Sequence, residues 1–122
     1  MKKLTDAEIS AALGGLAGWS AKDGKLHREY KFPDFGHAMG FMMTAAPAIE
    51  RLDHHPEWAN VYNRVSVDLS THDAGGITQK DFDLAALLEG IAKKLILANN
   101  CNTEFGISQV GFLCFPRCLL YL

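Results

Sequence analysis

The hydrophobic and polar positions predict a helix followed by a hairpin in the first third of the chain. Thr5 and Glu8 form a capping box, apolar residues follow at helical spacing, and Gly14–Gly15 supplies a stop. Two candidate strands, Trp19 to Ala21 and Leu26 to Phe32, then flank a turn that contains Asp-Gly. A turn of this kind between two short strand-like runs is typical of a β-hairpin.

A long amphipathic helix is predicted next. Asp34 can cap its start, and an apolar stripe at helical spacing follows, formed by Phe35, Met39, Met42, Met43, Ala46, Ile49 and Leu52. Pro47 lies inside this helix and is expected to kink it or to leave a local irregularity. The helix should end before Pro56, because the residue preceding a proline is pushed out of the α region.

The remaining pattern predicts two strands and a last helix. Trp58 to Asn60 is a candidate short strand, and Val61 to Thr71 alternates apolar with polar residues over a longer one. After a break at Gly75–Gly76, Thr78 can cap a helix whose apolar face contains Leu84, Leu87, Leu88, Ile91 and Leu95. The order helix-strand-strand-helix-strand-strand-helix predicts an α+β fold: a four-stranded antiparallel sheet with helices packed on one face.

Composition predicts one soluble domain followed by an unusual tail. The 122 residues are 48% hydrophobic with a net charge of −2, which argues against direct nucleic-acid binding. No apolar run reaches the roughly 18 residues of a membrane-spanning helix. Residues 1–95 lack cysteine, and we expect this domain in the cytoplasm. Residues 96–122 form an apolar tail with Cys101, Cys114 and Cys118, whose spacing does not favour a zinc site.

Three histidines at the ends of predicted elements point to an acid/base site. His54 and His55 follow the long helix about one turn after Glu50, and His72 ends the longer strand. Imidazole can both give and take a proton near neutral pH. Glu50 stands four residues before His54, so on a continuous helix it would orient that ring. Asp81, in the first turn of the last helix, supplies a second carboxylate.

Spacing alone leaves other interpretations open. A solvated helix terminus explains His54 and His55 as well as a site does, and His72 by itself is more typical of an exposed strand end. These three histidines and Asp53 are also candidate metal ligands, but the pattern is weak without a histidine pair at i, i+4. The sequence contains no phosphate-binding glycine loop and no nucleophile elbow.

Longer stretches of the sequence resemble a known family. Glu50 to Val65 reads Glu-Arg-Leu-Asp-His-His-Pro-Glu-Trp-Ala-Asn-Val-Tyr-Asn-Arg-Val, and the segments 69–78 and 81–85 follow in order. Their hallmark is an acidic residue, three further residues, His-His-Pro, an aromatic residue, a distant Thr-His and a later Asp. Over roughly residues 4–95 the chain is similar to the pterin-4a-carbinolamine dehydratase family.

The resemblance implies a dehydratase that converts 4a-hydroxytetrahydropterin, the 4a-carbinolamine, to quinonoid dihydropterin and water. This reaction recycles the tetrahydrobiopterin-type cofactor of an aromatic amino acid hydroxylase, and the family uses neither a metal nor an organic cofactor. By this resemblance His54 and His72 donate protons to the leaving hydroxyl, whereas His55 binds the pterin and accepts the ring proton. The supporting and pocket-wall residues are Glu50, Pro56, Trp58 and Asp81, with Asp81 beside the third histidine. Because the family is tetrameric, we expect a homo-oligomer.

The resemblance also implies an alternative function. Animal members act as dimerisation cofactors for a homeodomain transcription factor, and relatives serve as assembly factors, so the chain is alternatively a protein-interaction module on the same fold. The three histidines favour the enzyme, because a scaffold needs no convergent imidazoles. The sequence departs from the family at Pro47, where uninterrupted helix formers are expected, and from Ile96 onward, where the family has no counterpart.

Overall fold

The computed structural model describes the backbone of residues 1–104 and the side chains of residues 1–96. Most of the predicted tail therefore lies outside the described residues. The described elements are α1 (Asp6–Leu13), β1 (Ser20–Lys22), β2 (Lys25–Lys31), α2 (Phe35–Leu52), β3 (Glu57–Val61), β4 (Arg64–Leu69), a 3₁₀ turn η1 (His72–Ala74) and α3 (Gln79–Glu104).

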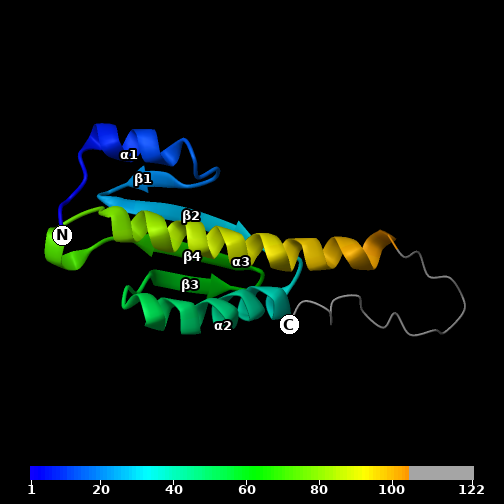
Figure 1. Ribbon diagram of the computed structural model, residues 1–122. Helices are drawn as coiled ribbons and strands as arrows, with labels where there is room; N and C mark the ends of the chain where they lie inside the picture. Colours follow the sequence, from blue (N-terminus) through cyan, green and yellow to red (C-terminus); the bar gives the residue numbers. More distant parts are fainter. Residues whose placement is uncertain (105–122) are drawn as a thin grey trace, which may run out of the picture.

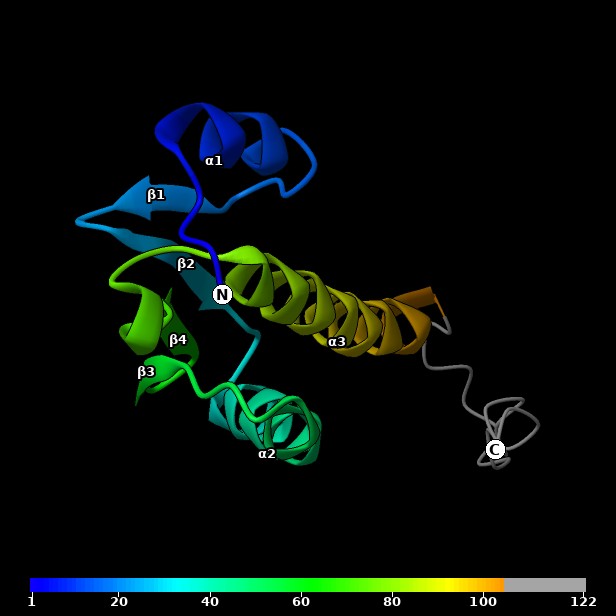
Figure 2. The same cartoon turned by 60° about the vertical axis from the view of Figure 1, so that its left-hand side comes forward.

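The four strands form one antiparallel sheet in the spatial order β1-β2-β4-β3. All three helices lie on one face of this sheet, with α3 between α1 and α2 (Figures 1 and 2). The predicted α+β fold and its order of elements are therefore confirmed. β1 and β2 lie within one residue of the predicted bounds. The last helix continues beyond the predicted boundary at Leu95 to Glu104.

Local capping explains where α1 and α2 begin. The Thr5 hydroxyl accepts the Glu8 N–H at 3.3 Å and the Glu8 carboxylate accepts the Thr5 N–H at 2.7 Å, so the predicted capping box is present. Asp34 accepts the His37 N–H at 2.8 Å. These backbone hydrogen bonds lower the pKa of the Glu8 and Asp34 carboxyls. The stabilisation is complete above the unfolded-state pKa and is lost as pH falls through the lower folded-state pKa.

α2 runs from Phe35 to Leu52 although Pro47 lies inside it. Pro47 is exposed, on the side of the helix opposite the buried Ala45. Water can therefore bond to the carbonyl that the missing proline N–H leaves unpaired. The irregularity expected at Pro47 does not end the helix, which carries Glu50 in its last turn.

The core lies between the sheet and the helices. Val65, Val67 and Leu69 alternate along β4 and are fully buried, as the period of two predicts. They belong to a cluster of buried apolar residues that also includes Leu26, Tyr30, Phe41, Ile49, Leu84 and Leu88. Burial of side chains from the sheet, α2 and α3 in one cluster fixes the start of α3 against the end of β4.

The fourth strand was predicted to begin at Val61, and this prediction is wrong. Val61 ends β3 and is 65% exposed, whereas β4 begins at Arg64. Tyr62 and Asn63 make the turn between them, with Tyr62 in the left-handed region at φ 53°. The Asn63 amide donates to the Phe32 carbonyl at 2.9 Å, which anchors this turn to the end of β2. A turn without glycine gave no local signal for a strand boundary.

A half-buried carboxylate on α3 connects the first hairpin to the helix layer. Glu89 Oε1 accepts the Trp19 indole N–H at 3.0 Å, the Arg28 Nε–H at 3.1 Å and the Tyr30 hydroxyl at 2.9 Å. The Arg28 guanidinium also stacks on the Tyr30 ring, 4.9 Å from its centroid. Burial raises the pKa of the Tyr30 phenol, and the neighbouring Glu89 charge raises it further.

Replacing Glu89 with alanine is expected to lower the free energy of unfolding by about 3 kcal/mol, because three donors lose their common acceptor. Urea denaturation followed by circular dichroism measures this change. Glu29→Ala is the matched control, since Glu29 is exposed and lies 3.9 Å from Arg64. We expect the control to change stability by less than about 0.5 kcal/mol. Equal losses in the two variants would contradict this role for Glu89.

Candidate active site

The end of α2 directs His54 into the protein. Asp53, the C-cap residue, has left-handed backbone angles of φ 47° and ψ 46°, and its N–H bonds to the Glu50 carbonyl at 3.1 Å. The chain therefore leaves the helix direction, and His54 turns toward the start of α3. The His54 side chain is 11% exposed, and its Nε2 lies 2.6 Å from Oδ1 of the fully buried Asp81. An imidazole and a carboxylate thus meet across 27 positions of sequence.

His55 has a different carboxylate partner. Its Nε2 lies 2.7 Å from Glu50 Oε1, and both side chains are largely exposed. The prediction that Glu50 would orient His54 is therefore wrong, although Glu50 does orient one of the histidines. The physical reason is the left-handed residue Asp53, because the i, i+4 rule holds only while the backbone stays helical.

His72 begins the short turn η1 directly after β4. Gly75, with a positive φ of 69°, closes the turn. The Thr71 N–H donates to the Gly76 carbonyl at 2.9 Å, and the Thr71 carbonyl accepts the Gly76 N–H at 3.4 Å. The exposed His72 lines a pocket of about 270 Å³, which also involves Lys25. The acidic partner that we expected beside His72, Asp81, bonds to His54 and connects to the His72 turn through the Thr71 hydroxyl at 2.9 Å.

The two expected pocket-wall residues lie at the start of the second hairpin. Pro56 is half-buried just before β3. Trp58 is half-buried, opposite Val67 of β4, and packs against the apolar core. A role for the Trp58 indole in stacking on a flat heterocycle stays a prediction.

Three residues near the histidines were missed as site residues. Thr71 entered only as part of a Thr-His pair, and Thr78 only as a helix cap. In the structure the Thr78 N–H donates to Asp81 Oδ2 at 2.8 Å, while its hydroxyl lies 2.7 Å from that of Thr71. Lys25 Nζ lies 2.6 Å from Glu57 Oε2, and this hydrogen bond raises the pKa of the Lys25 ammonium. The Thr78–Asp81 contact is local, three residues apart at the start of α3, and the pattern of a helix cap could have signalled it. No local pattern signals the Lys25–Glu57 contact, because it joins segments 32 positions apart that folding brings together.

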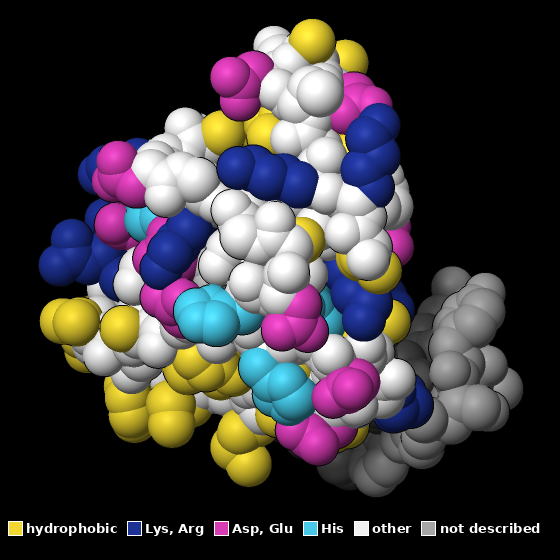
Figure 3. Space-filling view, turned by 90° about the vertical axis from the view of Figure 1, so that its left-hand side faces the viewer, with side chains coloured by type: hydrophobic (Ala, Val, Ile, Leu, Met, Phe, Trp, Pro, Cys, Tyr) yellow, Lys and Arg dark blue, Asp and Glu magenta, His cyan; other side chains and the backbone are white. Residues whose placement is uncertain are grey.

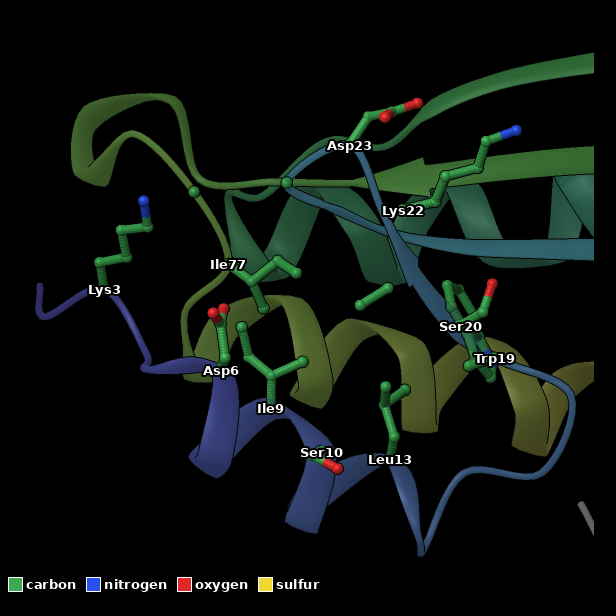
Figure 4. Close-up of a pocket in the computed structure, with 13 residues that line it drawn as sticks. Lys3, Asp6, Ile9, Ser10, Leu13, Trp19, Ser20, Lys22, Asp23 and Ile77 are labelled. Carbon is green, nitrogen blue, oxygen red and sulfur yellow. The ribbon is translucent and has the colours of Figure 1, made fainter.

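A larger pocket, of about 620 Å³, lies elsewhere, between α1 and the β1–β2 hairpin (Figure 4). Ile9, Trp19 and Ile77 contribute its apolar wall, and Lys3 and Asp6 contribute charges. Its lining contains no histidine. By contrast, histidine and acidic side chains lie next to one another on the face shown in Figure 3. The imidazole groups suited to acid/base chemistry near neutral pH therefore lie on the histidine-bearing surface and not in the larger pocket.

Within residues 1–96, whose side chains are placed, no group of three histidine, cysteine, aspartate or glutamate side chains could hold a metal ion. No described helix is long and apolar enough to cross a membrane.

Comparison with known proteins places this geometry in a family. The family model described as "Pterin 4 alpha carbinolamine dehydratase" matches residues 2–91. A protein of Solibacter usitatus named "Putative pterin-4-alpha-carbinolamine dehydratase" is 60% identical over 90 residues, which are 74% of this chain and 95% of that protein. A protein of the same name from Opitutus terrae is 52% identical over 90 residues, covering 73% of this chain and 93% of that protein.

A solved structure has the same fold. The crystal structure of a "transcriptional coactivator/pterin dehydratase" from Brucella melitensis matches with a TM-score of 0.72 and 47% sequence identity. The match covers 75% of this chain and 99% of that chain. The fold and the paired histidines thus define a protein of the pterin dehydratase class. The chain belongs to the pterin 4 alpha carbinolamine dehydratase family.

Proposed function

We propose that this chain dehydrates 4a-hydroxytetrahydropterin to quinonoid dihydropterin by histidine acid/base catalysis. One observation carries the proposal: the Nε2 atoms of His54 and His55 each lie within hydrogen-bond distance of a carboxylate, Asp81 and Glu50 respectively. Asp81 is also bonded to Thr71, the residue that precedes His72. Such pairing holds an imidazole ring in a fixed orientation. Family membership supplies the class of substrate.

The reaction needs a proton donor and a proton acceptor at neighbouring positions. The bond between C4a and the hydroxyl oxygen breaks, and this oxygen takes a proton and leaves as water. The N5–H bond also breaks, and its electron pair forms the C4a=N5 double bond. One proton is consumed and one released, so no oxidant, reductant or other co-reactant is needed. Imidazole groups suit both roles near neutral pH.

The histidines divide these roles. His54, backed by Asp81, and His72, on its exposed turn, donate protons to the leaving hydroxyl. His55, which is more exposed than His54, binds the pterin and takes the N5 proton. Glu50 orients His55, and Pro56 and Trp58 border the bound heterocycle.

The proposed setting is cofactor recycling in the cytoplasm. An aromatic amino acid hydroxylase would supply the 4a-carbinolamine, and a tetrahydrobiopterin-type cofactor is regenerated from the product. The enzyme works as a homo-oligomer and uses neither metal nor organic cofactor. The outer side of α2 supports an oligomer, because it exposes the apolar residues Phe35, Met39 and Met43.

Dehydration of chemically generated 4a-carbinolamine, followed by stopped-flow absorbance, tests the function. We expect the rate to change between about pH 5 and pH 8, the range in which imidazole titrates. EDTA should leave the rate unchanged, because every proton transfer is assigned to a side chain. A rate that is independent of pH over this range at constant substrate binding would rule out the histidine mechanism.

The alternative function is protein interaction, and one comparison favours it. The related protein of Brucella melitensis is described as a coactivator as well as a pterin dehydratase. The exposed apolar side of α2 fits a protein partner as well as a second copy of the chain. A chain that lacks dehydratase activity but retains a folded, self-associating structure would favour this alternative.

The tail beyond Leu95 is expected to be dispensable for catalysis. Every proposed site residue precedes Leu95, the family model matches residues 2–91, and residues 96–122 contain no histidine. A chain that ends at Leu95 should fold and keep the kcat of the full chain within about twofold. It should also be at least as soluble, because apolar residues of the tail are removed. Circular dichroism, the dehydration assay and gel filtration measure these properties; loss of folding or of activity would place the domain boundary further along α3.

A further inference from the structure

A chain of hydrogen-bonded side chains lies behind the His54 ring. Asp81 is fully buried, and its Oδ1 lies 2.6 Å from His54 Nε2. Its Oδ2 accepts the Thr71 hydroxyl at 2.9 Å and the Thr78 N–H at 2.8 Å. The Thr71 and Thr78 hydroxyl oxygens are 2.7 Å apart, and Thr78 is also fully buried. Both carboxylate oxygens thus have partners, as a buried charge requires.

The direction of these hydrogen bonds follows from counting protons. A carboxylate only accepts, so the Thr71 hydroxyl must donate to Asp81 Oδ2. A hydroxyl has one proton, which leaves Thr71 only its lone pairs for the contact with Thr78. Thr78 is therefore the donor to Thr71. The hydrogen bonds therefore all run in one direction, from the Thr78 hydroxyl to the Thr71 hydroxyl and from there to the Asp81 carboxylate.

This direction decides which nitrogen of His54 carries a fixed proton. With Oδ2 filled by two donors, Oδ1 is the acceptor that faces His54, so Nε2 must donate to it. Nε2 keeps this proton in both the neutral and the charged imidazole. Any proton that His54 gains or loses is therefore carried by Nδ1.

Thr71 also connects these hydrogen-bonded side chains to His72, the next residue. Thr71 and Gly76 flank the η1 turn, and their backbones are joined by two hydrogen bonds. A displacement of Thr71 would therefore change both the direction of the Asp81 carboxylate and the position of the His72 turn. Thr78 holds the other end, immediately before the first residue of α3.

We propose that Thr71 and Thr78 are positioning residues, which hold the Asp81 carboxylate so that His54 exchanges a proton with substrate through Nδ1 alone. When His54 donates, the Nδ1–H bond breaks, a bond to the leaving oxygen forms, and the ring remains as the neutral Nε2–H tautomer. The catalytic consequence rests on the proposed dehydratase function, whereas the tautomer of His54 does not.

The tautomer is tested on the full wild-type chain. Long-range ¹H–¹⁵N correlation spectra of histidine-labelled protein, recorded at increasing pH until the His54 signals are those of a neutral ring, separate Nε2–H from Nδ1–H rings. The His54 signals are those absent from His54→Gln. The expected result is a single Nε2–H tautomer, and an Nδ1–H tautomer would overturn the proposal.

Variants then separate positioning from a merely structural role. Thr71→Val should mix the two His54 tautomers and lower kcat about tenfold, with KM changed by less than about twofold. Thr71→Ser, which keeps the hydroxyl, should restore both properties. Thr78→Val and Thr78→Ser should show the same contrast with a smaller change in kcat. Thr44→Val, at an exposed position of α2, is the matched control and should behave as the wild type.

The outcomes distinguish this inference from the proposed function. A folded Thr71→Val variant with the wild-type tautomer and kcat, or a Thr71→Ser variant as impaired as Thr71→Val, would overturn the positioning role. If Thr71→Val does not fold, the His54 tautomer in the wild type and the kcat of Thr71→Ser still test the positioning role. An inactive wild-type chain with a single Nε2–H tautomer would refute the dehydratase but support the hydrogen-bond chain.

Discussion

Replacing Asp81 with alanine is expected to lower the free energy of unfolding by about 3–5 kcal/mol, the largest loss that we expect from any single site residue. Asp81 is fully buried and bonds to His54, Thr71 and the Thr78 N–H. Alanine leaves these three groups without their acceptor in a site that water does not reach. Urea denaturation measures the loss.

Asp83→Ala is the control for this experiment. Asp83 lies on the same helix but is exposed, with a 3.0 Å hydrogen bond from Gln79. Its removal should change stability by less than about 0.5 kcal/mol. A loss for Asp81→Ala no larger than that of the control would show that the buried network contributes nothing to stability.

Asp81→Asn separates stability from chemistry. Asparagine keeps the shape and one carbonyl oxygen, so this variant should fold. Its amide turns an N–H toward His54, which must then present a lone pair at Nε2 and hold its proton at Nδ1. We expect kcat to fall by about 10²–10⁴-fold, as for a general acid held in the wrong tautomer. Wild-type kcat in a folded Asp81→Asn variant would contradict the proposed role of His54.

Removing the histidines one at a time is expected to give the largest losses of activity. His54→Ala and His72→Ala should each slow turnover by about 10²–10⁴-fold, the range typical of a lost general acid or base. If the two donors partly replace each other, each single loss is smaller and the double variant is severe. His55→Ala should raise KM at least as much as it lowers kcat, because His55 also binds the pterin.

Two histidines outside the site serve as controls. His27 pairs with Asp68 on the sheet, and His37 pairs with Asp34 at the start of α2. His27→Ala and His37→Ala should keep kcat and KM within about twofold of the wild type. Stopped-flow kinetics on all five variants tests the assignment, and wild-type kinetics in the three site variants would refute it.

Short-range patterns were sufficient for most of the secondary structure. The Thr5–Glu8 capping box, the Asp34 cap and the alternation of Val65, Val67 and Leu69 all appear where the sequence predicted them. Each depends on residues within about one turn of helix or along one strand. The turn at Tyr62 was missed for the complementary reason: it contains neither glycine nor proline, and its anchor is the distant Phe32 carbonyl.

For the candidate site, too, the sequence was sufficient for the residues and insufficient for the contacts between them. The residue types and their order along the chain marked His54, His55, His72 and two carboxylates as a group. The pairing was assigned wrongly, because one left-handed residue, Asp53, ends the helical spacing on which the expected contact between Glu50 and His54 depended.

The sequence by itself determined the helices, the first hairpin and the set of chemically active side chains, because caps, periodicity and residue type act over short distances. Only the tertiary structure decided that β2 lies beside β4, which joins the two hairpins into one sheet. It also decided that Asp81 meets His54 and that Thr71 meets Thr78. These contacts form because burial of the apolar faces of β4 and α3 in a common core brings the end of the strand to the start of the helix, where buried polar groups must then satisfy one another.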